Sequence, residues 1–108
     1  MGIYSKYVVR LGSNADDVLM LVGRVYYLWV APGMRKQGLG TKLLRMLEKE
    51  AVKVGCEIMR LEVNPKNEVA MHLYERHGYR KIRRLKRYYA NGANALRLEK
   101  RLYAKGYP

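Results

Sequence analysis

The chain has 108 residues, with 22 Lys and Arg against 9 Asp and Glu and a formal net charge of +13. This length fits one domain, so we expect a single domain over residues 1–108. No run of residues approaches the roughly 20 consecutive apolar positions that span a bilayer, which argues against a membrane protein. One cysteine, Cys56, excludes an intramolecular disulfide and a cysteine-based metal site, and no metal ligands are predicted. No apolar signal core follows the N-terminus, so we expect a cytoplasmic protein.

The positive charge is the strongest compositional feature. It favours anionic partners such as nucleic acid, ribosomes or a small phosphorylated ligand, and it does not distinguish among them. The densest run, residues 76–87, reads RHGYRKIRRLKR. It could lie along a phosphate backbone, or it could be a solvated strand whose charges prevent aggregation.

The N-terminal third predicts three antiparallel strands. Residues 6–11 form a β-rich run, residues 12–17 a turn and residues 18–22 a second strand. A turn at Gly23-Arg24 then leads into a third strand over residues 25–31.

The remaining chain alternates helices and strands. Apolar residues recur at helical spacing from Leu39 to Val54, and Gly55 follows as a C-terminal cap. We then expect a strand over residues 57–63 and a second helix, capped by Asn67, that ends at Gly78. Two last strands, residues 80–89 and 95–102, flank a hairpin turn at Asn91-Gly92. The order β-β-β-α-β-α-β-β indicates an α/β (α+β) fold.

A glycine-rich stretch, VAPGMRKQGLGTKLL over residues 30–44, lies between the third strand and the first helix. Glycines let backbone N–H groups approach a ligand closely, and a helix N-terminus carries about half a positive charge. The stretch therefore predicts an anion-binding corner. Its spacing matches neither the P-loop nor the dinucleotide fingerprint.

The pattern Arg35-x-x-Gly38-x-Gly40, after a strand ending in Val30-x-Pro32, resembles the signature of the GNAT superfamily of acetyl-CoA-dependent N-acetyltransferases. The segments LEVNPKNEVAMHLYERHGYRKI and YYANGANALRLEK are similar to the branch that acetylates protein N-termini. The resemblance implies a GNAT-like mixed central sheet, lacking the usual first strand and two helices. It also implies that the anion is the pyrophosphate of acetyl-CoA. The implied cofactor-binding residues are Leu28, Trp29, Val30, Arg35, Lys36, Gln37, Gly38, Leu39, Gly40, Thr41, Asn67 and Tyr74.

The second helix offers a polar groove. At 100° per residue, Asn67, Ala70 and Tyr74 fall within about 60° of one another on one face. The resemblance places the pantetheine arm there, with the amide of Asn67 on a carbonyl and the hydroxyl of Tyr74 near the sulfur.

Acetyl transfer to an amine needs a base, an oxyanion site and an acid. An α-amino group has a pKa near 8 and is mostly protonated at pH 7, so we expect Glu62, near the end of its strand, to act as the general base. A backbone N–H near Val30 could stabilise the oxyanion, and Tyr74 could protonate the departing thiolate.

Tyr88 and Tyr89 match the tyrosine pair with which the family binds the substrate's N-terminal residues. The branch usually continues with an acidic Asp-Gly-Glu-Asp stretch, but this chain has Asn91-Gly92-Ala93-Asn94. The loss of negative charge predicts a different acceptor preference.

The resemblance implies an N-terminal part that is shortened by one strand and two helices. This would leave the sheet edge at residues 6–11 and an apolar face of the sheet uncovered. A homodimer would cover both. The leading expectation is acetyl transfer to a protein N-terminus. The alternatives are a coenzyme A-binding regulatory module without independent activity, and a basic scaffold associated with nucleic acid or the ribosome.

Overall fold

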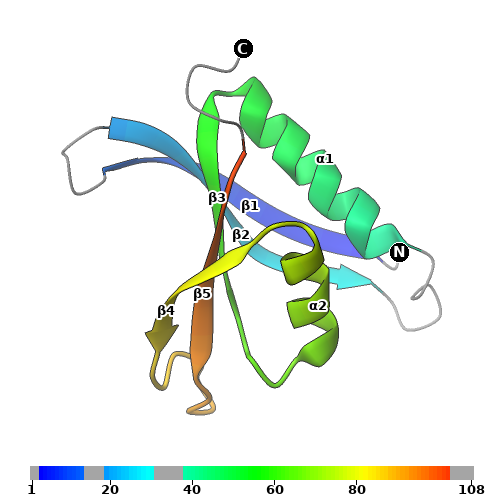
Figure 1. The fold of residues 1–108 in the computed structure, drawn as a ribbon, viewed down its shortest axis with the longest axis vertical. Helices are drawn as coiled ribbons and strands as arrows, with labels where there is room; N and C mark the ends of the chain where they lie inside the picture. Colours follow the sequence, from blue (N-terminus) through cyan, green and yellow to red (C-terminus); the bar gives the residue numbers. More distant parts are fainter. Residues whose placement is uncertain (1–2, 14–18, 31–37, 103–108) are drawn as a thin grey trace.

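The computed structural model describes residues 3–13, 19–30 and 38–102. Its elements are β1 (Ile3–Ser13), β2 (Leu19–Val30), α1 (Leu39–Lys53), β3 (Cys56–Val63), α2 (Glu68–Arg76), β4 (Arg80–Leu85) and β5 (Ala95–Arg101). The strands form one sheet in the order β1-β2-β3-β5-β4 (Figure 1). β2 and β3 are parallel and the other neighbours antiparallel, which confirms the predicted mixed sheet.

The predicted turn at Gly23-Arg24 is wrong. β2 is one continuous strand, and Gly23 and Arg24 pair with Val9 and Val8 in the antiparallel ladder with β1. The predicted turn over residues 12–17 begins too early, because Gly12 and Ser13 still belong to β1 and residues 14–17 lie outside the described part. The described order is therefore β-β-α-β-α-β-β.

Gly23 is needed for packing rather than for a turn. A Cβ at Gly23 would collide with the sulfur of Met59 and would lie 3.4 Å from Cβ of Ala51. Met59 and Ala51 are fully buried, so neither can move into solvent. The glycine lets α1 and β3 pack closely against β2.

We therefore expect Gly23→Ala to lower the free energy of unfolding by about 1–3 kcal/mol through overpacking. Gly40→Ala is the matched control, since a Cβ there meets only Leu73, at 3.5 Å, and alanine favours the helix by about 0.5–1 kcal/mol. Urea unfolding of both variants measures the difference. Equal stability of Gly23→Ala and the unmodified chain would contradict the packing argument.

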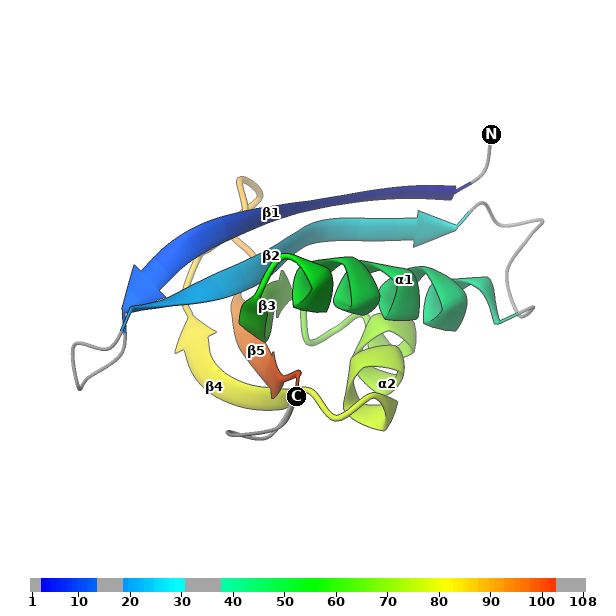
Figure 2. The ribbon, with the colours of Figure 1, turned by 90° about the horizontal axis from the view of Figure 1, so that it is seen from above.

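Both predicted helices are confirmed, and both cover the same face of the sheet. α1 buries Leu44, Leu47 and Ala51, and α2 buries Tyr74. These side chains share one core with strand residues, namely Val25, Met59, Leu61, Val63, Leu96 and Leu98. Figure 2 shows α1 and α2 on one side of the β1–β2 ribbon. We call this side of the sheet the helix face.

The C-terminal hairpin has a longer connection than predicted. β4 ends at Leu85 rather than at Tyr89. Arg87 adopts a left-handed backbone with a φ of 50°, and its N–H donates to Oδ1 of Asn94 at 3.0 Å. A left-handed residue cannot continue a strand, so residues 86–94 form a loop. Gly92, with a φ of 84°, makes the tight turn expected at Asn91-Gly92.

The parallel strands β2 and β3 separate toward their C-terminal ends. Their last paired residues are Val25 and Leu61, although β2 continues to Val30 and β3 to Val63. In Figure 1, β2 turns away from β3, and α2 lies between the diverging ends. No helix among the described residues is long and apolar enough to cross a membrane.

Candidate active site

The glycine corner at the start of α1 has the backbone geometry of an anion site. Gly38 caps the helix with a φ of 72°, a conformation that side-chain-bearing residues rarely adopt, and no atom of the described residues lies within 4 Å of the position that a Cβ would take there. The first backbone hydrogen bond of the helix runs from N–H of Lys42 to the carbonyl of Gly38, at 3.1 Å. The N–H groups of Leu39, Gly40 and Thr41 precede it and have no acceptor within the helix. The first turn contains no acidic residue and the cap forms no side-chain hydrogen bond, so no acidic or capping side chain of the described residues neutralises the positive end of the helix dipole, which favours an anion there.

The separation of β2 from β3 provides the second part of the site. Beyond Val25, residues 27–30 of β2 pair with β1 on one edge, but they have no β3 partner on the other. An extended strand directs the backbone groups of alternate residues to each edge, so this edge offers hydrogen bonds to an extended ligand. Leu28, Trp29 and Val30, predicted to pair with the pantetheine arm, lie in this segment. Arg35, Lys36 and Gln37 are outside the described residues.

α2 contributes its predicted polar groups. Oδ1 of Asn67 accepts the N–H of Ala70 at 3.1 Å and caps the helix, which leaves its amide N–H₂ available to a ligand carbonyl. Tyr74 is 7% exposed and packs edge-on against Tyr79, with ring centroids 5.7 Å apart. Burial, with a smaller contribution from Tyr89, raises the pKa of Tyr74 to about 12. Tyr74 is therefore a neutral hydrogen-bond donor at any physiological pH.

Glu62 is held by two arginines. Its Oε2 accepts hydrogen bonds from Arg24 at 2.5 Å and Arg97 at 2.7 Å, and its side chain is only 6% exposed. The other oxygen, Oε1, lies 3.5 Å from the hydroxyl of Tyr88. Burial alone would raise the pKa of Glu62, but the two guanidinium groups outweigh it and lower the pKa below its ordinary value. Glu62 is thus a fixed carboxylate with one oxygen left for a further partner.

The loop after β4 brings the tyrosine pair to Glu62. The rings of Tyr88 and Tyr89 are perpendicular, with centroids 5.1 Å apart. N–H of Tyr89 donates to the carbonyl of Ala93 at 3.1 Å, which fixes the loop. Burial, together with nearby Tyr88 and Glu62, raises the pKa of Tyr89. The Tyr88 hydroxyl near Glu62 and the packing of the Tyr88 and Tyr89 rings bring the predicted base and the tyrosine pair together, and Tyr89 is near enough to Tyr74 to contribute to its raised pKa.

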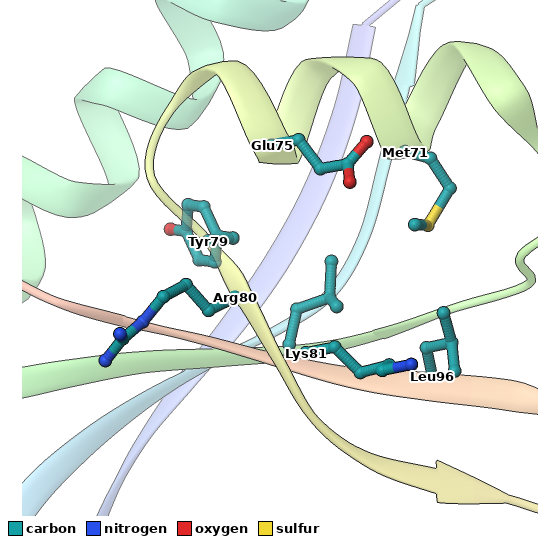
Figure 3. Close-up of a pocket in the computed structure, with 7 residues that line it drawn as sticks. Met71, Glu75, Tyr79, Arg80, Lys81 and Leu96 are labelled. Carbon is teal, nitrogen blue, oxygen red and sulfur yellow. The ribbon is translucent and has the colours of Figure 1, made fainter.

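A separate hollow of about 430 Å³ lies between α2 and the β4–β5 pair (Figure 3). Its lining residues are Met71, Glu75, Tyr79, Arg80, Lys81, Leu96 and Leu98. None of the predicted site residues lines it. The described residues contain no group of His, Cys, Asp and Glu side chains that could hold a metal ion.

Residues 16–79 match the family described as the acetyltransferase (GNAT) family. The chain belongs to this family. The glycine corner, the diverging parallel strands and α2 beside them all lie within or adjoin the matched region, so the predicted family resemblance is confirmed.

Among curated proteins, the chain is 38% identical to N-alpha-acetyltransferase 30 of Xenopus laevis over 77 residues, which are 71% of this chain and 28% of the relative. It is 34% identical to N-alpha-acetyltransferase 30 of Dictyostelium discoideum over 90 residues, 83% of this chain and 49% of the relative. The chain thus spans less than half of the length of either protein. Among solved structures, the NatC complex bound to Gag peptide and CoA is similar at a TM-score of 0.79 and 26% identity, covering 92% of this chain and 61% of the other.

Sequence reasoning missed Arg24 and Arg97, which define the surroundings of Glu62. A signal was present, because each arginine interrupts an apolar strand: LVGRVYY around Arg24 and NALRLEK around Arg97. The interpretation of Gly23-Arg24 as a turn removed Arg24 from the sheet and concealed its role.

Proposed function

We propose that the protein transfers the acetyl group of acetyl-CoA to the α-amino group of a protein N-terminus. The observation that supports this most is the convergence of Glu62, Tyr74 and the Tyr88-Tyr89 pair around the diverging ends of β2 and β3. Family membership and the similarity to two N-alpha-acetyltransferases give further support.

The residues present fit coenzyme A. The N–H groups of Leu39, Gly40 and Thr41, which have no acceptor within the helix, would bind its pyrophosphate, and the edge of β2 that lacks a β3 partner would pair with its extended arm. The amide N–H₂ of Asn67 would bind one of its carbonyls. Acetyl-CoA supplies an activated thioester, in which a C–S bond is exchanged for the C–N bond of the product.

Glu62 orients the amine and then receives its proton. A carboxylate with a lowered pKa is a poor base toward an ammonium group of pKa near 8. The neutral amine must therefore be the species that binds, with its N–H donating to Oε1. When the nitrogen attacks the thioester it becomes positively charged and strongly acidic, and Glu62 can then take the proton.

Tyr74 acts at the leaving sulfur. Its phenol would donate a hydrogen bond to the sulfur as negative charge develops there. The thiol of coenzyme A collects its proton from solvent, because a phenol of pKa about 12 is a weaker acid than a thiol of pKa near 8.5.

The first test is cofactor binding. Acetyl-CoA at 100 times its dissociation constant should stabilise the folded protein by about 2.7 kcal/mol, measured as a thermal shift. Gly38→Val should reduce the shift, because a β-branched residue is strained at a φ of 72° and its side chain would enter the anion site. A well-folded protein without any shift would contradict coenzyme binding.

The second test is the reaction itself. Incubation with acetyl-CoA and a mixed library of peptide N-termini, followed by mass spectrometry, should show products heavier by one acetyl group on the α-nitrogen. A thermal shift without any product would instead support a coenzyme-binding regulatory module. The cytoplasmic location, the homodimer and the association with ribosome or nucleic acid rest on the sequence alone and stay predictions.

A further inference from the structure

We propose that the preferred acceptor is a protein N-terminus followed by acidic residues, which bind to a row of arginines beside Glu62. This inference rests on the proposed function. It concerns the face of the sheet opposite the helix face, which we call the arginine face.

The strand register places charged side chains side by side on the arginine face. In β3, Met59, Leu61 and Val63 belong to the core under the helices, so the alternating Arg60 and Glu62 point to the opposite side. Residues opposite each other on neighbouring strands share a face. Glu62 is opposite Arg97 of β5, and Arg97 is opposite Arg83 of β4. A second row runs from Arg24 of β2 through Arg60 of β3 and Glu99 of β5 to Arg80 of β4.

The charges on this face do not balance. The two rows hold two carboxylates and five arginines, namely Arg24, Arg60, Arg80, Arg83 and Arg97. Arg60 forms an ion pair with Glu99 at 2.8 Å, while Glu62 forms ion pairs with both Arg24 and Arg97. Arg83 is exposed and makes no ion pair with any carboxylate of the described residues. Three positive charges are thus in excess in the two rows, and the neighbouring loop of residues 91–94 adds no acid.

The acceptor approaches over the arginine face. The anion corner of α1 and the phenol of Tyr74 belong to the helix face, so the acetyl donor occupies that side. Glu62 is reached from the opposite side, where the hydroxyl of Tyr88 lies 3.5 Å from its Oε1. A peptide whose N-terminal amine contacts Glu62 therefore extends its following residues across the arginine face.

The distances match a short peptide. Neighbouring strands are about 4.8 Å apart, so Arg97 lies about 5 Å and Arg83 about 10 Å from Glu62 in the hydrogen-bonding direction. An extended chain advances about 3.3 Å per residue, so carboxylates at the second to fourth acceptor positions can reach Arg97 and Arg83. Lysine at these positions would meet like charges.

The test compares acetylation of three peptides that differ only at positions 2–4, which carry Glu, Gln or Lys. We expect kcat/KM to fall about 10-fold from Glu to Gln and again from Gln to Lys, mainly through KM, with smaller differences at high salt. Equal values for Glu and Gln peptides would overturn the proposal.

A pair of adjacent variants separates the arginine face from net charge. Arg83→Glu should lower the preference for Glu over Lys peptides about 10-fold or more. Arg84→Glu changes the net charge identically, but Arg84 is opposite Leu96 and lies on the helix face, so this variant should keep the preference. An equal loss in both variants would contradict recognition by the arginine face.

A binding measurement makes the inference separable from catalysis. Fluorescence anisotropy of labelled Glu and Lys peptides, with coenzyme A present, should show the same order of affinity whether or not acetylation occurs. Preferential binding without any acetylation would leave the arginine face supported and the proposed function wrong. Equal affinity would overturn the inference alone.

Discussion

Replacing Glu62 by Gln is expected to lower kcat by about 10²- to 10⁴-fold, with acetyl-CoA binding largely preserved. The substitution keeps the shape of the side chain but removes the group that accepts the proton of the attacking amine. Initial rates with a fixed acceptor peptide, together with the acetyl-CoA thermal shift, measure the two effects separately. Turnover equal to that of the unmodified protein would show that another group receives the proton.

Glu48→Gln is the matched control. Glu48 is also a mostly buried carboxylate with two partners, Lys100 at 3.0 Å and the hydroxyl of Tyr79 at 2.8 Å, but it lies on α1 away from the site. Both variants lose a paired carboxylate and some stability, whereas only Glu62→Gln should lose turnover. Similar losses of kcat in both would indicate general loosening of the fold rather than chemistry.

The lowered pKa of Glu62 also predicts a pH dependence. Because the folded-state pKa lies below the ordinary value of 4.5, the ionised side chain stabilises the fold above that value. This contribution should disappear as pH falls through the folded-state pKa, and Glu62→Gln should lack it in acid unfolding curves. Between pH 6 and 9 Glu62 stays ionised, so a rise in kcat/KM there belongs to the acceptor's α-amino group, whose pKa is near 8.

The family and the local backbone geometry of its motif residues could be predicted from sequence because their signals are local. The glycine spacing at Gly38 and Gly40 requires one backbone conformation, and the capping Asn67 fixes the start of α2 and hence the position of Tyr74. These features depend on neighbours within a few residues. The structure places them as the pattern predicts.

The surroundings of Glu62 could not be predicted, because they depend on register between distant strands. Glu62 lies 38 residues after Arg24 and 35 residues before Arg97, and the three meet only through the pairing of β2, β3 and β5. A glycine in an apolar run is read locally as a turn, although Gly23 is required by contact with Met59. Likewise, the end of β4 depends on the bond between Arg87 and Asn94 across the loop.

Replacing Tyr74 by Phe is expected to lower kcat by about 10²-fold, since one hydrogen bond to the developing thiolate is lost while the ring still fills the core. Tyr79→Phe is the matched control, because Tyr79 is equally buried and packs on Tyr74, but its hydroxyl is bonded to Glu48. Tyr79→Phe should lower the free energy of unfolding by about 1 kcal/mol and leave kcat unchanged.

The pH profile distinguishes a hydrogen-bond donor from an acid that titrates. Because burial raises the pKa of Tyr74 to about 12, above the ordinary value of 10, the phenol stays protonated throughout the range in which the protein is assayed. The profile of kcat should therefore show no alkaline decline from Tyr74 below about pH 11, and the ratio of unmodified to Tyr74→Phe rates should stay constant from pH 7 to 10. A ratio that falls toward unity between pH 8 and 10 would mean that Tyr74 ionises in this range. This result would contradict the proposal that a neutral phenol donates a hydrogen bond to the sulfur.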